Sequence, residues 1–203
     1  MEKVYDILRL RDDLKWEEIP VLQMEYTYIY DSTHVTAFGQ ICAGENALFV
    51  RLWANQSEIR AEEYGIDGAP YLDSCLEFFF RPEENDPRYL NFEFNFNKCL
   101  YLGVGVDLES RQRILLEDRE EIFKPITERT EKGWEVTYQI PYSFIQQYFP
   151  EFCITEGKVI WGNCYTCADL AEKPYYRSWN QVDENAFTFH CPEHFGKMIV
   201  GKV

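Results

Sequence analysis

A strict alternation of aromatic and polar residues in YLNFEFNFN, residues 89–97, most constrains the fold. Neighbouring side chains of a β-strand point to opposite faces. One face of this segment therefore comprises Phe92, Phe94 and Phe96, and the other comprises Asn91, Glu93, Asn95 and Asn97. The pattern predicts a strand with one face packed in a core. Polar groups about 6.8 Å apart on the other face can bond the hydroxyls of a sugar-sized ligand, although a solvent-facing sheet is the simpler interpretation.

Two further segments show the same period. In CLEFFF, one face comprises Leu76, Phe78 and Phe80, and the other comprises Cys75, Glu77 and Phe79. In VIWGNCYTC, one face comprises Ile160, Gly162, Cys164 and Thr166, and the other comprises Trp161, Asn163, Tyr165 and Cys167. Glu77 is flanked by apolar neighbours, and an unpaired buried charge is costly. It should therefore contact a ligand hydroxyl, a cation or a basic side chain, with an internal ion pair as an equal alternative. Asn163 is a candidate for the same polar row.

The residue pattern of the whole chain predicts a β-protein. Strand patterns occupy residues 34–43, 46–54, 75–81, 89–97, 99–106, 133–140 and 159–167. A short helix is predicted at 141–149, and long loops at 56–70 and 107–131. We expect one domain over residues 1–203: an all-β, mostly antiparallel β-sandwich of immunoglobulin or jelly-roll type, with at most one or two short helices. The first 30 residues should pack along its side.

Charge and cysteine usage limit the partners. The formal net charge is −15, so the surface should repel nucleic acid and anionic lipid. No apolar run reaches the length of about 18 residues needed for a membrane span, and no export signal is evident at the start. The seven cysteines, an odd number, suit reduced thiols. These features predict a soluble, cytoplasmic protein that binds neither nucleic acid nor membrane.

Six segments in order, LDSCLEFFF, YLNFEFNFN, GWEVTYQIP, WGNCYT, RSW and FHCPEHFG, resemble carbohydrate-binding module family nine and its DOMON-like β-sandwich relatives. The resemblance runs from about residue 16 to the end of the chain. It implies a β-sandwich that binds sugars without cleaving them. In some members the terminal saccharide lies between two aromatic rings, often with structural calcium.

The resemblance also implies site residues. The glutamate that opens a family strand matches Glu77, the strand asparagine matches Asn163, and one stacking aromatic matches Phe189. Tyr71 is the ring closest to the position of the second stacking aromatic, and Glu93 occupies the position of a basic cleft residue.

We therefore predict non-catalytic recognition of a mono- or oligosaccharide. The predicted ligand-binding residues are Tyr71, Glu77, Glu93, Asn95, Asn163, Arg177, Trp179, Phe189 and His190. Aromatic rings would stack on the sugar while carboxylates, amides and the guanidinium bond its hydroxyls. No catalytic residue, metal ligand or certain cofactor is predicted. Calcium held by the acidic loops 66–73 or 82–88 remains an alternative to plain solvated loops.

Other functions are weaker alternatives. One is a glycoside hydrolase or an accessory protein of carbohydrate catabolism. Asp73 and Glu77, about 13 Å apart on a strand, are too distant for a catalytic pair, although Glu93 or Glu135 could supply the second acid. Zinc ligation by Cys164, Cys167, His190 and His194 has suitable spacings. It would, however, require two cysteines on opposite strand faces. Haem binding of the DOMON type would draw its axial ligands from Met24, His34, His190 and Met198.

Overall fold

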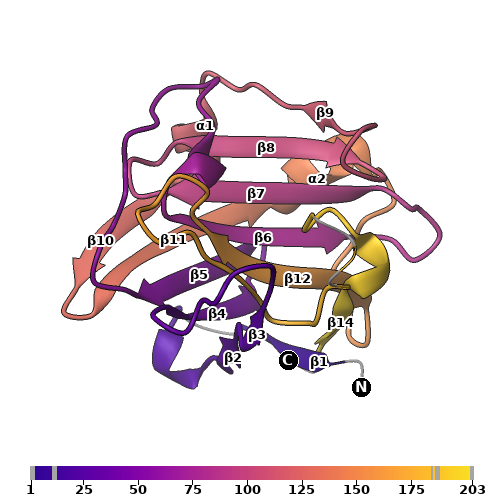
Figure 1. The fold of residues 1–203 in the computed structure, drawn as a ribbon. Helices are drawn as coiled ribbons and strands as arrows, with labels where there is room; N and C mark the ends of the chain where they lie inside the picture. The colour runs from indigo at the N-terminus through magenta and orange to yellow at the C-terminus, as the bar shows by residue number, and fades with distance from the viewer. Residues whose placement is uncertain (1–2, 11–12, 184, 186–187, 202–203) are drawn as a thin grey trace.

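The computed structural model describes residues 3–10, 13–183, 185 and 188–201. Two sheets pack face to face (Figure 1). The front sheet, called the cavity sheet below, contains β6 (Cys75–Arg81), β7 (Tyr89–Asn95), β8 (Leu100–Gly105), β9 (Gln112–Arg113), β12 (Val159–Cys167), β13 (Tyr176–Ser178), β14 (Gly196–Val200) and β3 (Tyr26–Thr27). The second, called the back sheet, contains β2 (Leu22–Gln23), β4 (Thr36–Ala43), β5 (Ala47–Asn55), β10 (Ile126–Thr130) and β11 (Gly133–Pro141).

Strand β1 (Val4–Arg9) joins the two sheets. It pairs in parallel with β14 through Val4–Ile7 and in parallel with β4 through Leu8 and Arg9. All other strand pairs in the described parts of the chain are antiparallel. The β-sandwich prediction is therefore confirmed, with a mixed sheet in place of an antiparallel one at this seam.

Helical structure is short, as expected. It consists of α1 (Arg119–Phe123), α2 (Tyr142–Tyr148) and three 3₁₀ turns, η1 (Trp16–Glu18), η2 (Pro70–Leu72) and η3 (Pro192–His194). Helix α2 confirms the prediction at 141–149, since Phe144 and Ile145 are its buried residues. The span 107–131, predicted as a loop, contains β9, α1 and β10. The exposed side chains of β10 carry little strand signal; its backbone pairing with β11 defines the strand.

The alternating segments bury both of their faces. Phe78, Phe80, Phe92 and Phe94 lie in the core between the sheets. The opposite face of the cavity sheet supports a second buried cluster, formed by Tyr28, Cys75, Phe79, Tyr89, Tyr165, Cys167, Val182, Phe189 and Phe195. The predicted polar row is part of this outer face but is buried as well, because loops cross over it: Asn91, Glu93 and Asn95 are at most 2% exposed. The solvent-facing interpretation of this row is therefore wrong.

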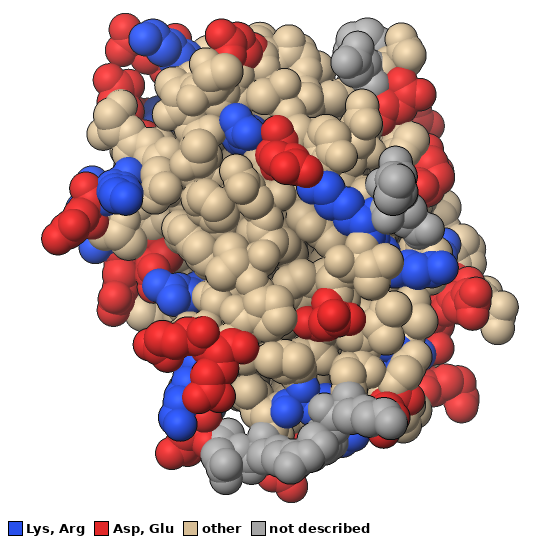
Figure 2. Space-filling model, turned by 90° about the horizontal axis from the view of Figure 1, so that it is seen from below, with Lys and Arg blue, Asp and Glu red and all other residues tan. Residues whose placement is uncertain are grey.

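The surface carries charges of both signs. Figure 2 shows many acidic groups near the outline of one face and a few toward its middle, with basic groups singly or in small groups among them. Acidic residues outnumber basic ones 35 to 20 over the whole sequence. Among the described residues, no helix is both long and apolar enough to cross a membrane.

Candidate functional site

A cavity of about 310 Å³ opens over the outer face of the cavity sheet. Its lining residues come from seven segments of the chain: Tyr28 and Ile29; Tyr71; Glu77; Glu93; Leu108 and Arg111; Cys167, Asp169 and Tyr176; and Thr188, Phe189 and His190. The volume is at the small end of the range of about 300–1,000 Å³ that ligand pockets occupy. Strands supply the base, and the loops that cross the sheet supply the walls.

Two carboxylates form the base. Glu77 on β6 and Glu93 on β7 are directly opposite in the strand register, and each is 2% exposed. The thiol of Cys167 donates to Glu77 Oε1 at 3.0 Å. Burial raises the pKa of Glu77 to about 7. Burial and then the neighbouring charge of Glu77 raise the pKa of Glu93 well above its ordinary value.

A cationic group lies beside Glu93. Arg111 Nη1 is 3.5 Å from Glu93 Oε1, which also accepts a hydrogen bond from Asn91 Nδ2 at 2.9 Å. Arg111 also contacts the ring nitrogens of His190, and Tyr89 Oη is 2.7 Å from His190 Nδ1. Burial, followed by the charge of Arg111, lowers the pKa of His190 to about 2. His190 is therefore neutral, and Arg111 provides the positive charge at this end of the cavity.

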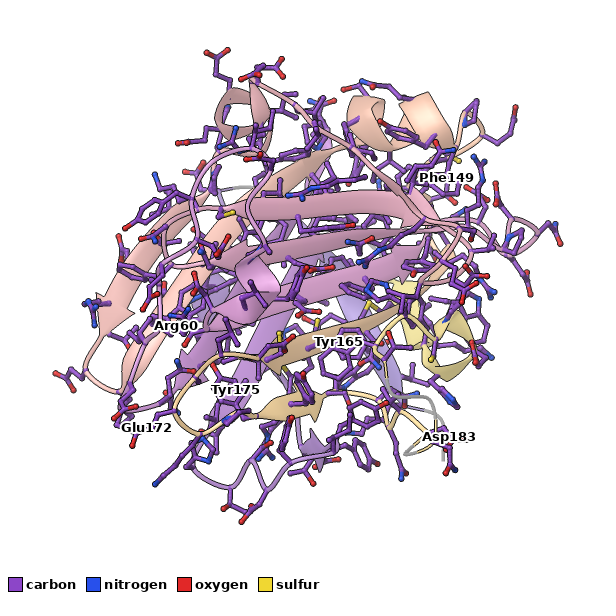
Figure 3. The ribbon with its side chains drawn as sticks, turned by 45° about the horizontal axis from the view of Figure 1, so that its top comes forward. Arg60, Phe149, Tyr165, Glu172, Tyr175 and Asp183 are labelled. Atoms are coloured by element: carbon purple, nitrogen blue, oxygen red, sulfur yellow. The ribbon has the colours of Figure 1, made fainter. Side chains whose placement is uncertain are left out.

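The aromatic wall is built on Phe189. Its ring stacks on Tyr165 at a centroid distance of 4.3 Å and an interplanar angle of 14°. The Tyr165 hydroxyl donates to the Phe189 carbonyl at 3.2 Å, which fixes the loop on the strand. Figure 3 shows Tyr165 on β12 and Tyr175 on the segment that leads into β13. Tyr28 and Tyr176 contact Phe189 at centroid distances of 5.7 and 5.5 Å.

A second ring and a strained residue complete the rim. Tyr71, on η2, packs edge-on against Tyr101 with centroids 6.1 Å apart. The Tyr176 hydroxyl donates to Asp169 Oδ1 at 2.7 Å.

Ile29 is 52% exposed and has a φ of 62°. This left-handed conformation is unfavourable for a β-branched residue, and such strain is concentrated at functional sites.

The structure brings together five of the nine predicted residues: Tyr71, Glu77, Glu93, Phe189 and His190 all line the cavity. For Glu77, the sequence left open a ligand, a cation, a basic partner or an internal ion pair. Its contact in the structure is a thiol, whereas the ion pair with Arg111 is made by Glu93.

The other four predicted residues lie outside the cavity lining. Asn95 donates to Asp73 and to the Glu63 carbonyl, and Asn163 bonds the backbone of Asn180 in both directions.

Arg177 donates to the carbonyls of Met24, Glu25, Ser32 and Val35, which ties the N-terminal segment to β13. Trp179 packs edge-on against Tyr5 in the core between the sheets. The side chains of Asn95, Asn163 and Arg177 therefore bond the protein itself, and Trp179 fills its core.

Sequence reasoning missed the remaining lining residues, of which Arg111 and Cys167 matter most. Arg111 lies in the long charged loop at 107–131, a type of segment that often covers a site. Cys167 shares the alternating face of Tyr165, and that period was the available signal for it. Tyr28, Ile29, Asp169, Tyr176 and Thr188 reach the cavity by loop paths that no local pattern reveals.

The two cysteines of the zinc alternative lie on opposite faces of β12, and acidic residues of both candidate calcium loops bond the protein itself. Cys164 lies in the core between the sheets and Cys167 on the cavity face, so these two thiols cannot share a zinc ion with the histidines. In the first acidic loop, Asp73 Oδ2 accepts hydrogen bonds from the backbone of Glu62 and Glu63. In the second, Asp86 forms an ion pair with Arg88.

A small cavity that has aromatic walls and carboxylates at its base can hold a small ligand with hydroxyl groups. Sequence comparison assigns the family: residues 4–200 match the model of carbohydrate-binding family 9. The chain belongs to this family, whose members bind carbohydrate without cleaving it. No curated protein matches the chain.

Solved structures share the fold. A candidate carbohydrate-binding protein from Bacteroides uniformis is 21% identical, with a TM-score of 0.79 over 98% of this chain and 100% of that one. A family 9 module from Caldicellulosiruptor kristjanssonii in complex with cellotriose is 14% identical, with a TM-score of 0.65 over 99% of this chain and 95% of that one. A family 9 module from the same organism in complex with glucose is 15% identical, also with a TM-score of 0.65, over 99% and 97% of the two chains.

Proposed function

We propose that the cavity binds a free monosaccharide or the terminal residue of an oligosaccharide of the glucose type. The observation that carries this proposal is the convergence of Phe189, Tyr71 and the buried Glu77–Glu93 pair on one small opening. Pyranose rings have apolar C–H faces that pack on aromatic rings, and hydroxyls that need fixed acceptors. The volume suits one sugar ring, which favours a chain end over the middle of a polymer.

The residues divide the work by chemistry. Phe189, held by Tyr165, supplies an apolar surface, and Tyr71 supplies the second ring. Glu77 and Glu93 accept hydrogen bonds from sugar hydroxyls, and Arg111 donates one. Affinity should be modest, because water also bonds the hydroxyls well and few groups fix the ligand. Glucose and cellotriose in the family 9 modules of C. kristjanssonii support ligands of this class.

Isothermal titration calorimetry with glucose, cellobiose and cellotriose tests the proposal. Phe189→Ala and Glu77→Gln should each weaken binding by at least about tenfold, since one stacked ring or one charged hydrogen bond contributes roughly 1–3 kcal/mol. Phe38→Ala provides a control, because Phe38 stacks on Trp53 in the back sheet, outside the cavity lining. Unchanged saccharide binding in both cavity variants would contradict the site.

The cellular role is part of the same proposal: recognition of sugars during carbohydrate catabolism in the cytoplasm. The seven cysteines are free thiols, which suits a reducing compartment. Fractionation of cells that produce the tagged full-length protein tests the location, and a growth defect of a deletion strain on oligosaccharides tests the role. Recovery from the culture medium would contradict the cytoplasmic assignment.

A further inference from the structure

Three metal-ligating side chains meet beside the carboxylate pair at the base of the cavity. Cys75 on β6 and Cys167 on β12 are directly opposite in the strand register, and Glu77 follows Cys75 by two residues on the same face. The two sulfur atoms and one oxygen of Glu77 all lie within 4.8 Å of one another. All three side chains are buried. They come from two neighbouring strands, so the backbone of the sheet fixes their separation.

The donor set selects the kind of metal. Two thiols and a carboxylate are ligands for zinc, whereas calcium and magnesium take oxygen ligands. Zn–S bonds of about 2.3 Å and Zn–O bonds of about 2.1 Å place tetrahedral ligand atoms roughly 3.5–3.8 Å apart. Cys167 Sγ and Glu77 Oε1 are 3.0 Å apart, joined by the thiol proton that a metal would displace. Tetrahedral ligation requires this one pair of atoms to separate by about 0.5 Å.

Two further observations support a cation here. First, Glu77 and Glu93 oppose each other at the base, while the ion pair of Arg111 is with Glu93. Among the described residues, no basic side chain forms an ion pair with Glu77, so the zinc ion would be its counter-charge. Because the ion displaces two thiol protons, the net charge that faces Glu93 stays the same. Second, Cys167 and Glu77 line the cavity, so an ion held there is accessible from solvent.

We propose that Cys75, Glu77 and Cys167 form a three-ligand site for a zinc-type divalent ion, with the fourth coordination position open to the cavity. Such open sites leave one position for water or a ligand oxygen. If the proposed sugar site is correct, a hydroxyl of the bound sugar takes this position; that step alone depends on the proposed function. The zinc site itself depends only on the three side chains.

Titration of the reduced, metal-free, full-length protein with Zn²⁺ alone tests the site. We expect one ion per chain, and Co²⁺ in its place should give the intense charge-transfer absorption of thiolate ligation. Cys167→Ser and Cys75→Ser should each weaken binding by about 100-fold or more. Cys153→Ser is the control, because that cysteine is exposed and outside the trio. Binding by wild type and control with loss in both site variants would support the site.

A second variant guards against misfolding. Glu77→Gln keeps the shape of the side chain and both thiols, and should weaken Zn²⁺ binding by about tenfold while the Co²⁺–thiolate band persists at saturation. The site is wrong if the reduced wild type binds no stoichiometric Zn²⁺, or if a Cys75→Ser/Cys167→Ser double variant binds equally well. Sugar titrations of the metal-free wild type distinguish the two proposals. If this protein binds saccharide but no zinc, only the zinc site is wrong; if it binds zinc but no saccharide, only the sugar site is wrong.

Discussion

Glu77 and Glu93 are directly opposite each other on adjacent strands, and both are buried at the base of the same cavity. Like charges placed so are destabilising, and burial adds to the penalty. The structure compensates with Arg111, whose guanidinium lies 3.5 Å from Glu93. A buried carboxylate pair with a single adjoining cation costs folding free energy, but it places hydrogen-bond acceptors where a polar ligand can reach them.

Arg111→Met should lower the free energy of unfolding by about 3 kcal/mol, because it leaves Glu93 buried without its cation. Arg111→Lys keeps the charge and should recover part of this loss. Urea denaturation of the two variants at neutral pH measures both effects. Equal stability of Arg111→Met and wild type would show that the ion pair contributes nothing to folding.

Arg177→Met should destabilise the protein without affecting the cavity. Arg177 is 8% exposed, and its guanidinium bonds four backbone carbonyls of residues 24–35, which would lose these hydrogen bonds. The expected loss in unfolding free energy is about 3 kcal/mol. The exposed Arg129, which lies over Phe96, provides a matched control whose change to Met should cost about 0.5 kcal/mol or less. A specific loss of saccharide affinity in folded Arg177→Met would instead place Arg177 in the binding site.

His190 should make the fold sensitive to acid. The pKa of His190 is about 2 in the folded protein and about 6.5 when unfolded, so the unfolded chain binds one more proton between these values. Its contribution to stability is therefore present above pH 6.5 and is lost at about 1.4 kcal/mol per pH unit as pH falls below it. The groups that face it are Tyr89, Arg111 and Glu93.

Replacement of His190 by glutamine separates this effect from that of Glu77 and Glu93. The raised pKa values of these two carboxylates make the folded protein more stable, not less, as pH falls. The difference in unfolding free energy between wild type and His190→Gln should shrink as pH falls from 7.5 to 5. Denaturant titrations at several pH values give this difference directly. A difference that stays constant over the range would mean that His190 takes up its proton in the folded state.

Ile29→Gly should leave the unfolding free energy unchanged or raise it by up to about 1 kcal/mol. Glycine relieves the left-handed backbone at a φ of 62° and adds entropy to the unfolded chain, so the two effects oppose each other. Val21 is similarly exposed but has no positive φ, and its change to Gly should destabilise by about 0.5–1 kcal/mol. Thermal unfolding of both variants tests the contrast. A larger loss at position 29 than at 21 would remove the argument for strain at the rim.

Local pattern predicted the strands and their faces well. The period of two in residues 75–81, 89–95 and 159–167 correctly separated the rings of the core from Glu77, Glu93 and Tyr165. It missed β1, β2, β3, β9, β10, β13 and β14, which are strands of two to six residues. Strand β1 is defined by its two parallel neighbours, and parallel partners leave no turn signal between them.

The sequence by itself determined that this chain is built of β-strands, which side chains share a strand face, and that Glu77 needs a partner. Those properties follow from the alternation of side chains along a strand. Only the tertiary structure decided that Arg111 meets Glu93, that Cys167 meets Glu77, and that Arg177 and Trp179 belong to the framework. These contacts join residues far apart in the chain, and their geometry depends on how loops cross the sheet, which short-range periodicity does not encode.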